Sequence, residues 1–256
     1  MKFLAFDTST DVMSIALTDG ARVWQHSGPG GAKSSTTLIP AILALLAESG
    51  LALDGLDAIA FGRGPGSFTG LRTACAVAQG LAFGARQGAG IPVLPVDTLM
   101  ALAEEARFQL AEKAEKPGAA GLRITALLDA RMDEMYVQRF EWAGDGTCKS
   151  LDECSLVRPE NLAPAGKDLL AGNVFGVYAG RLPAGLAAFS CVEALPTATA
   201  MLRLAPALAA AGHCVDAALA LPLYVRDKVA FTTDERAQAK EDKARAALAA
   251  EMANPK

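Results

Sequence analysis

The feature that most constrains the fold is a pattern that occurs twice in the chain. Residues 2–6 form a short apolar run that ends in Asp7 and is followed by a second run of the same kind. Residues 123–128 form another apolar run that ends in Asp129, and residues 134–142 alternate between apolar and polar side chains as its partner. Each pair of runs is typical of a β-hairpin. Two similar halves that both open with a hairpin sheet predict a duplicated α/β architecture.

The rest of the pattern alternates strands with helices. Apolar runs between turn residues predict strands over residues 2–6, 12–17, 22–26, 57–61, 91–96, 123–128, 134–142, 151–157 and 168–171. Apolar residues at helical spacing predict helices over residues 34–50, 69–84, 97–112, 159–163 and 197–211. Pro40 lies inside the first of these helices, so that helix either starts near Thr37 or is kinked.

The chain divides into two halves and a tail. We expect an N-terminal half over residues 1–112 and a C-terminal half over residues 122–229, which the apolar helix at 197–211 completes. Residues 113–121 are rich in Lys, Glu, Gly and Ala, a composition that favours a linker. Residues 230–256 carry five acidic and five basic side chains, which predicts a solvated helix or a flexible tail.

Charge and composition exclude several classes of function. The chain has 24 Lys and Arg residues against 28 Asp and Glu residues, a net charge of −4, so it lacks the basic field with which a protein binds nucleic acid on its own. Its two histidines lie far apart and its five cysteines include no C-x-x-C pair, so we expect no bound metal. No apolar run reaches a membrane span of about 20 residues, and the opening is too short for a signal peptide. We therefore expect a cytoplasmic protein.

A glycine-rich segment follows the strand predicted over residues 57–61 and precedes the helix predicted from Thr69. Such a turn can present backbone N–H groups to a phosphate. A phosphate loop requires G-x-x-x-x-G-K-[ST], however, and no lysine occurs between Phe61 and Gly84. The alternative is a tight structural turn in which Ser67 or Thr69 caps the helix. The residues of this structural glycine loop are Gly62, Gly64, Gly66, Ser67, Gly70 and Arg72.

Two further features admit a functional and a structural interpretation. Asp7 ends the first strand, where a carboxylate can hold a metal or a water beside a nucleotide phosphate, but a lone Asp in a hairpin turn is more often a turn residue. The helix over residues 69–84 carries small residues at intervals of four, which suits either internal packing or the close approach of a partner helix. These small residues are Gly70, Ala74, Ala78 and Ala82. No Ser-His-Asp, Cys-His or paired-carboxylate arrangement stands out in the sequence, so we assign no catalytic residue.

Four segments, in their order along the chain, carry a resemblance to a known family. They are Leu4–Thr10, Ile59–Arg72, Leu128–Arg131 and Pro222–Arg226. Together they resemble the TsaB family over residues 1–229, and the glycine-rich part of the second segment is highly specific. The resemblance implies the actin-like ATPase superfamily fold. This is an α/β fold of two RNase H-like subdomains, in which mixed sheets are flanked by helices.

The resemblance also implies a function and partners. TsaB proteins serve the synthesis of N6-threonylcarbamoyladenosine beside the tRNA anticodon as a non-catalytic dimerisation subunit. TsaD transfers the threonylcarbamoyl group, the ATPase TsaE completes the bacterial complex, and TsaB pairs with TsaD or with itself. We therefore expect a scaffold that is no enzyme by itself, has no cofactor of its own and meets tRNA only indirectly. The implied partner interface lies on the two helices that begin near Thr36 and Thr69, at Leu38, Ile42, Leu45, Thr69, Leu71, Ala74, Cys75 and Ala78.

The same resemblance implies a vestigial nucleotide site. Its residues are Asp7, Ser9, Asp129 and Gly172. The chain lacks the H-x-x-x-H metal pair of TsaD, the long side chains at 131–133 would crowd the second hairpin turn, and only Asn173 follows Gly172 where a glycine pair is expected. Weak binding of ATP or ADP stays open, whereas hydrolysis is not expected. Residues 33–35 are Lys-Ser-Ser where many relatives have a histidine, a departure from the family pattern.

Two alternatives come from other classes of protein. One is a small-molecule kinase or ATPase of the same fold, which predicts nucleotide turnover and magnesium binding at Asp7. The other is a protease, which requires a nucleophile and a base that the sequence does not offer.

Overall fold

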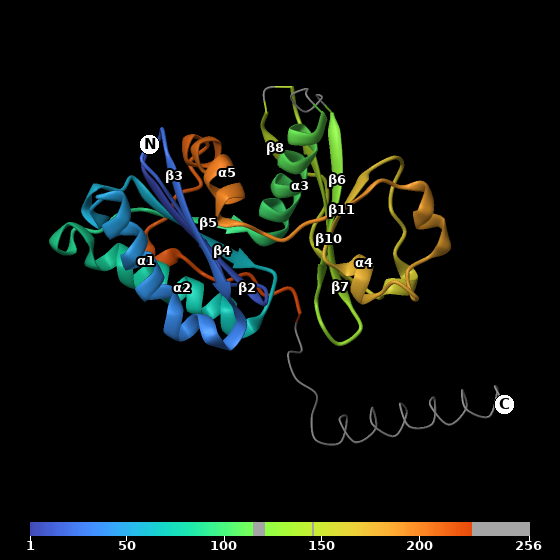
Figure 1. Cartoon of the computed structure of the whole chain (residues 1–256), viewed down its shortest axis with the longest axis horizontal. Coiled ribbons are helices and arrows are strands. Elements are labelled where there is room, and N and C mark those ends of the chain that lie inside the picture. Colours follow the sequence, from blue (N-terminus) through green and yellow to red (C-terminus); the bar gives the residue numbers. More distant parts are fainter. Residues whose placement is uncertain (115–120, 145, 227–256) are drawn as a thin grey trace, which may run out of the picture. The chain divides into compact units, whose positions relative to one another are not determined.

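The computed structural model describes residues 1–114, 121–144 and 146–226, which contain two mixed β-sheets (Figure 1). The first sheet has the strand order β3-β2-β1-β4-β5. Its strands are β1 (Phe3–Asp7), β2 (Val12–Thr18), β3 (Val23–Pro29), β4 (Ala58–Gly64) and β5 (Val93–Asp97). Because β1 pairs antiparallel with β2 and parallel with β4, the sheet joins a three-stranded meander to two parallel strands.

The second sheet repeats this arrangement. Its strand order is β11-β10-β6-β7-β8, and β9 also pairs with β7. The strands are β6 (Leu122–Asp129), β7 (Met135–Trp142), β8 (Cys148–Ser150), β9 (Ser155–Val157), β10 (Leu169–Gly172) and β11 (Cys191–Glu193). The central strand β6 pairs antiparallel with β7 and parallel with β10, as β1 does with β2 and β4. The predicted duplication of the hairpin sheet is therefore confirmed.

Helices cover both faces of the first sheet. The helices are α1 (Ser34–Ser49), α2 (Phe68–Gly84), α3 (Thr98–Ala114), α4 (Val174–Val177) and α5 (Ala198–Ala210). Along β1 the side chains alternate between two cores, since Leu4 and Phe6 pack with α1 and α2 while Phe3 and Ala5 pack with α5. All four are fully buried, which explains why β1 is an uninterrupted apolar run. Figure 1 shows α1 and α2 on one side of this sheet and α5 on the other.

Helix α3 packs against both sheets. Its Ala101 belongs to the core that the first sheet shares with α5, whereas Leu99 and Leu102 belong to the core of the second sheet. The buried Glu104 of α3 accepts hydrogen bonds from Arg203 of α5 and from Arg107, at 2.7–2.9 Å. This paired charge fixes α3 to α5, because a buried carboxylate is tolerated only when it is paired.

The C-terminal half ends earlier than residue 229. Helix α5 was expected to complete the second half, but it packs against β1 and β2 of the first sheet. Val215 then pairs with Val93 of β5 through two backbone hydrogen bonds of 2.8 and 3.0 Å. The chain therefore returns to the first sheet after β11. The predicted tail over residues 230–256 and most of the predicted linker lie outside the described residues.

Several local predictions differ from the structure. Helix α1 starts at Ser34 and continues through Pro40, so the predicted start near Thr37 was wrong. The single strand predicted over residues 151–157 is replaced by β8 and β9, and the helix predicted over 159–163 is a short 3₁₀ turn. The 3₁₀ turns are η1 (Gly31–Lys33), η2 (Leu53–Gly55), η3 (Ala85–Gly88), η4 (Pro159–Asn161), η5 (Ala184–Ala188) and η6 (Ala217–Leu219). None of the described helices combines the length and the apolar run that crossing a bilayer requires.

Candidate functional site

The β1–β2 hairpin turn holds Asp7 in a closed environment. The carboxylate has no solvent exposure, and its Oδ1 accepts hydrogen bonds from the backbone N–H and the hydroxyl of Ser9 at 2.9 and 2.6 Å. The hydroxyl of Thr98 lies 3.5 Å from Oδ2. Burial raises the pKa of Asp7 to about 6, and the hydrogen bonds offset only part of this effect. Asp7 and Ser9 therefore form one cluster, but the cluster faces the protein interior.

The glycine loop encloses this carboxylate. A Cβ atom at Gly62 would lie 1.8 Å from Oδ2 of Asp7, and one at Gly70 would lie 1.8 Å from the carbonyl oxygen of Thr8. The hydroxyl of Thr8 donates a 2.7 Å hydrogen bond to the carbonyl of Gly70. Glycine is needed at both positions because the loop approaches the hairpin turn too closely for any side chain.

The same loop is fixed to the hairpin turn and to the C-terminal segment. The backbone N–H of Ser67 donates to the carbonyl of Ser9 at 2.7 Å, and a Cβ at Gly66 would lie 2.5 Å from the Cβ of Ser9. Ser67 occupies the N-cap position of α2, but its side chain makes no capping hydrogen bond. Gly64, at φ +123°, leaves room for the carbonyl of Leu223, which a Cβ would approach to 2.5 Å. These contacts show that the glycine loop packs against the β1–β2 turn and against the C-terminal segment.

Arg72, the last residue of the glycine motif, also has a packing role. Its guanidinium lies 3.8 Å from the ring centre of Phe68, and its Nε donates to the hydroxyl of Tyr224 at 3.2 Å. The rings of Phe68 and Tyr224 are 5.3 Å apart. This contact joins the start of α2 to the segment that contains Tyr224, two regions that both contributed to the family resemblance.

The second hairpin turn, between β6 and β7, is filled by its own side chains. Asp129 accepts hydrogen bonds from the hydroxyl of Tyr178 at 2.7 Å and from the backbone N–H of Arg131 at 2.9 Å. Burial and the hydrogen bond to Asp129 raise the pKa of Tyr178. The side-chain oxygen of Asn173 accepts from the backbone N–H of Asp129 at 2.9 Å. Gly172 packs against β6, since a Cβ there would lie 1.8 Å from the carbonyl oxygen of Leu127.

An ion pair joins the two hairpin turns. The guanidinium of Arg131 contacts Asp11 of the first turn and lies 3.2 Å from Asp129 of its own turn. Residues 131–133 all have positive φ values between 55° and 60°, although none of them is glycine. This backbone is costly for side chains of this size and is held by contacts such as that of Asp133 with Arg181 at 2.6 Å.

The described residues offer little for metal chemistry. Among them, no group of three or more His, Cys, Asp and Glu side chains is placed to hold a metal ion. Asp7 and Asp129, which would flank a phosphate in a working site, each accept hydrogen bonds from their own hairpin or its neighbours. The predicted vestigial residues are thus placed by the structure in two separate clusters, one in each half.

The residues predicted as a partner interface are mostly core residues. Seven of the eight are less than 9% exposed, namely Leu38, Ile42, Leu45, Leu71, Ala74, Cys75 and Ala78. Only Thr69 lies at the surface. The assignment of the seven was therefore wrong, because side chains that are buried within the chain cannot contact a partner. The spacing of these residues correctly predicted two helices, but the face on which they lie packs against the first sheet.

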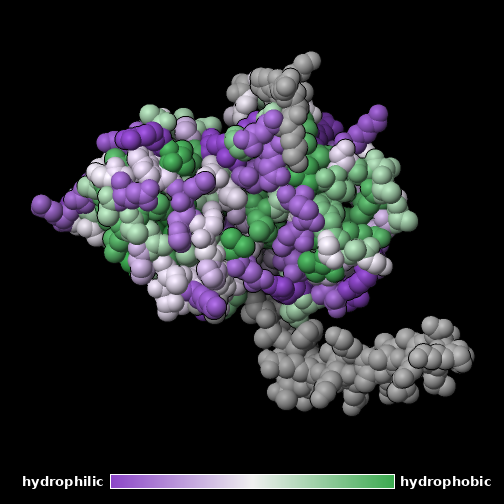
Figure 2. All heavy atoms as spheres, in the orientation of Figure 1, coloured by the Kyte–Doolittle hydropathy of each residue, from purple (hydrophilic) through white to green (hydrophobic). Residues whose placement is uncertain are grey.

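The exposed sides of the two helices nevertheless carry few charges and several apolar side chains. Helix α1 has 16 residues with Glu48 as its one charged side chain, and α2 has 17 residues with only Arg72 charged. Most surface helices of globular proteins carry charged and polar residues outward. Here the exposed apolar positions that we call the α1–α2 outer face are Ile39, Leu43, Ala76, Gly80 and Phe83. Exposed serine and threonine side chains lie at the start of α1. Figure 2 shows mainly pale or green residues over this part of the molecule, with scattered hydrophilic ones.

A segment after α5 extends this apolar surface along α2. The thiol of Cys75 and the amide of Gln79 both donate to the carbonyl of Ala220, at 3.1 and 2.9 Å, and so fix the segment to α2. Its Leu219 and Leu221 are 68% and 65% exposed, the highest values among the large hydrophobic side chains of the described residues. Sequence reasoning missed this surface, although two leucines separated by one alanine in a short loop are a signal that could have indicated it.

Comparisons with known proteins agree with this architecture. Residues 29–254 match the family described as TsaD, tRNA N6-adenosine threonylcarbamoyltransferase. A protein of Haemophilus influenzae named tRNA threonylcarbamoyladenosine biosynthesis protein TsaB is 33% identical over 253 residues, which cover 90% of this chain and 96% of that protein. The protein of the same name from Escherichia coli is 32% identical over 238 residues, which cover 90% and 97%.

Solved structures show the same relationship. YeaZ from Pseudomonas aeruginosa is 36% identical with a TM-score of 0.72, and the match covers 87% of this chain and 99% of that one. A second structure from that organism, described as similar to peptidase YEAZ, is 36% identical with a TM-score of 0.73 over 88% and 99%. The predicted fold, two RNase H-like subdomains of the actin-like superfamily, is confirmed. By its sequence and its fold, this chain belongs to the TsaB family.

Proposed function

We propose that this protein is an accessory subunit that supports threonylcarbamoyl transfer to a tRNA adenosine and performs no catalytic step itself. The family supports the pathway, since the relatives are named for tRNA threonylcarbamoyladenosine biosynthesis. The observation that carries the accessory role is the α1–α2 outer face, on which Leu43 is 54% exposed, Phe83 52% and Ile39 46%. Large apolar side chains exposed on two neighbouring helices are typical of a surface that another protein covers.

The two hairpin turns support the absence of a catalytic role. Asp7 is enclosed by Gly62 and Ser9 and has no exposed surface, so it is not available to a magnesium ion or to a phosphate. In the second turn, Asp129 is engaged by Tyr178 and Arg131. A kinase or ATPase of this fold needs these positions open, and the described residues give no support to a protease either. We therefore expect no cofactor that belongs to this chain itself.

The partner that suits the α1–α2 outer face best is a TsaD-family protein. Because this chain itself matches the TsaD family over residues 29–254, a TsaD protein has helices that correspond to α1 and α2. Two related surfaces can pack about an approximate twofold axis, as two copies of one chain do in an isologous dimer. The same face would join two copies of this chain when TsaD is absent. The TsaE ATPase would then join the assembled pair, and tRNA would be bound by the complex.

Reconstitution with omission of single components tests this proposal. Purified chain, TsaD, TsaE, tRNA, threonine, bicarbonate and ATP are combined with the remaining components that supply the threonylcarbamoyl group, and modified tRNA is measured. We expect modification that depends on this chain, and no ATP hydrolysis or transfer by the chain alone near about 1 s⁻¹, a rate within the ordinary enzyme range. Unchanged modification without the chain, or turnover by the pure chain that Asp7→Asn abolishes, would contradict the proposal.

A further inference from the structure

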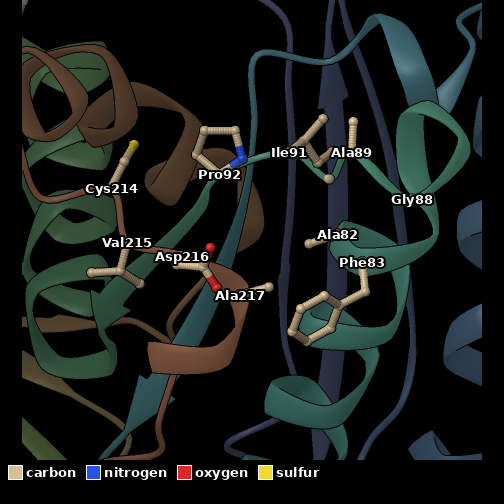
Figure 3. A pocket seen from close by; sticks show the side chains of 11 residues that line it. Ala82, Phe83, Gly88, Ala89, Ile91, Pro92, Cys214, Val215, Asp216 and Ala217 are labelled. Atoms are coloured by element: carbon tan, nitrogen blue, oxygen red, sulfur yellow. The ribbon is translucent and has the colours of Figure 1, made fainter.

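A hollow of about 540 Å³ lies beside the C-terminal end of α2 (Figure 3). It is formed by the end of α2, by the loop that contains η3 and by the segment that follows α5. Its lining residues with side chains larger than a methyl group are Phe83, Ile91, Pro92, Cys214, Val215 and Asp216. In Figure 3 the ring of Phe83 lies on one side of the hollow, and Val215 and Asp216 lie on the other.

A strained loop forms one wall of this hollow. Arg86 and Gln87 have φ values of 52° and 56°, and Gly88 follows at 90°. The left-handed conformation is unfavourable for the two larger residues, so other contacts must hold it. Asp54 supplies one, since its carboxylate accepts from the backbone N–H of Arg86 at 2.6 Å, and the guanidinium of Arg86 donates to the carbonyl of Leu56 at 2.8 Å.

The opposite wall is fixed as well. The backbone groups of Val215 and Val93 exchange two hydrogen bonds, at 2.8 and 3.0 Å, which attach this wall to the edge of the first sheet. Both walls are thus held by hydrogen bonds to other parts of the first half. A hollow that is preformed in this way loses little conformational entropy when a side chain enters it.

The lining indicates the chemistry of the group that would enter. Among the residues that line the hollow, Asp216 is the one with a charged side chain, and it is exposed at the rim. One of its oxygens accepts from the backbone N–H of Ala218 at 2.8 Å, which fixes the position of the carboxylate. The remaining lining is apolar apart from backbone groups and the thiol of Cys214. An apolar side chain next to a cation would therefore complement both parts.

The hollow is continuous with the surface proposed for docking. Phe83 belongs to the α1–α2 outer face and also lines the hollow, and Gly80 lies one turn before it on the same side of α2. On the other rim, η6 carries the highly exposed Leu219 two residues after the lining residue Ala217. A protein that covers the outer face therefore reaches the hollow without a separate site.

We propose that this hollow is an anchor site for the TsaD-family partner, which inserts a bulky apolar side chain that is adjacent to a Lys or Arg. This inference rests on the proposed function, because it takes the α1–α2 outer face as the docking surface. It adds a pocket that would carry much of the affinity, since apolar side chains in preformed pockets are typical of the few interface residues that dominate binding.

Filling the hollow tests the proposal. Ala89 lines the hollow and is exposed, so Ala89→Trp should occupy it without disturbing the core. The matched control is Ala187→Trp, at an exposed position of η5 in the other half of the chain. We expect Ala89→Trp to weaken binding of the TsaD partner at least tenfold, and Ala187→Trp to bind as the wild type does. Wild-type affinity of a folded Ala89→Trp variant would overturn the anchor site.

Cys214 provides a second readout that needs no substitution. This partly exposed thiol lines the hollow, whereas Cys191 is exposed on β11 and serves as an internal control. We expect saturating TsaD partner to slow the reaction of Cys214 with N-ethylmaleimide at least tenfold and to leave the rate at Cys191 unchanged. An unchanged rate at Cys214 would overturn the proposal, even if Ala89→Trp proved unstable.

A substitution on the outer face separates this inference from the proposed function. Leu43→Arg changes a residue of α1, a helix that contributes no lining residue to the hollow. Suppose that Leu43→Arg abolishes binding, that Ala89→Trp binds with wild-type affinity, and that the partner does not slow the modification of Cys214. In that case only the anchor site is wrong. If Leu43→Arg binds normally, the proposed docking surface itself is wrong.

Asp216→Asn tests the cation of the proposed occupant. It should weaken binding of the partner several-fold and reduce the dependence of the affinity on salt concentration. An unchanged affinity would show that no cation of the partner lies beside Asp216.

Discussion

Asp7 shows how the environment of one residue decides between catalysis and structure. A carboxylate at the end of a central strand is a common position for a residue that binds a metal or a phosphate-linked water. In this chain Ser9 donates two hydrogen bonds to it and Gly62 lies directly against it. Of the two interpretations of the glycine loop, a phosphate cradle and a tight structural turn, the contacts favour the second, because the loop closes the hairpin turn over Asp7.

The raised pKa of Asp7 predicts a pH dependence of stability. Its pKa is about 6 in the folded protein against 3.8 in the unfolded chain, so the folded state binds the proton more tightly. The favourable contribution is complete below pH 4 and is lost as the pH rises through 6. Asp7→Asn keeps an oxygen that can accept from Ser9 but does not ionise. Relative to the wild type, we expect this variant to gain about 2 kcal/mol of unfolding free energy between pH 4 and pH 7.5.

Denaturant unfolding of both proteins at several pH values measures this difference. Identical pH profiles of the wild type and Asp7→Asn would show that Asp7 titrates normally and is not enclosed. Serine at position 9 offers a further check, because its hydrogen bonds lower the pKa of Asp7. Ser9→Ala should therefore shift the wild-type profile to higher pH.

The glycine loop gives a second prediction at the scale of one residue. Gly62→Ala places a methyl group 1.8 Å from an oxygen of Asp7, which the hydrogen bonds from Ser9 hold in place. We expect a loss of about 1–3 kcal/mol in unfolding free energy, the usual range for overpacking. Gly185→Ala in η5 is the control, since no atom lies within 4 Å of its added Cβ, and its effect should stay within about 0.5 kcal/mol. Equal thermal unfolding of the two variants would show that the loop does not pack closely on the turn.

At the scale of whole elements, the helices show what sequence periodicity can and cannot provide. The spacing of Leu38, Ile42 and Leu45 correctly predicts a helix with an apolar face. It does not say which face meets the sheet, because Ile39 and Leu43 make the opposite face apolar too. The usual contrast with a charged face is missing, and this is the feature on which the proposal of a docking surface rests.

The placement of α5 was hidden from the sequence for a related reason. Its inward residues are Ala, Met and Leu, which can pack against either sheet. Tertiary contacts determine that α5 packs against the first sheet. They include the hydrogen bond of 2.9 Å from the backbone N–H of Ala198 to the hydroxyl of Ser14 and the contact of Arg203 with Glu104. Such contacts join residues far apart in the chain and leave no periodic signal. The hairpins, in contrast, are local, and both were predicted.

Neighbouring alanines of α2 allow a direct test of the two faces. Ala78 is fully buried, so Ala78→Arg should place an unpaired charge in the core and prevent stable folding. Ala76 is exposed on the outer face, so Ala76→Arg should fold with a melting temperature close to that of the wild type but lose association with TsaD and with itself. Circular dichroism and sedimentation velocity distinguish these outcomes. A stable Ala78→Arg variant that no longer associates would restore the interface first predicted from the sequence.

At the scale of the whole molecule, the charge of −4 predicts that the chain alone binds tRNA weakly. Affinity for nucleic acid comes mainly from contacts of Lys and Arg with phosphates, and acidic residues outnumber these here by 28 to 24. We expect no submicromolar binding of tRNA by the isolated chain at 0.15 M salt, measured by fluorescence anisotropy. Tight binding whose logarithm falls steeply with the logarithm of salt concentration would show a basic surface that the overall charge conceals.

If this chain assists threonylcarbamoyl transfer by docking and not by chemistry, the reconstituted complex should depend on its outer face and not on Asp7. Formation of modified tRNA is measured in the reconstituted complex with wild-type chain, Asp7→Asn and Leu43→Arg, after each variant is shown to be folded. We expect wild-type activity with Asp7→Asn, because the Asp7 carboxylate is enclosed, and loss of at least 90% of the activity with Leu43→Arg, because Leu43 lies on the outer face. Full activity with Leu43→Arg together with loss of activity with Asp7→Asn would contradict this expectation, because the chain would then act through its hairpin turn and not through its helices.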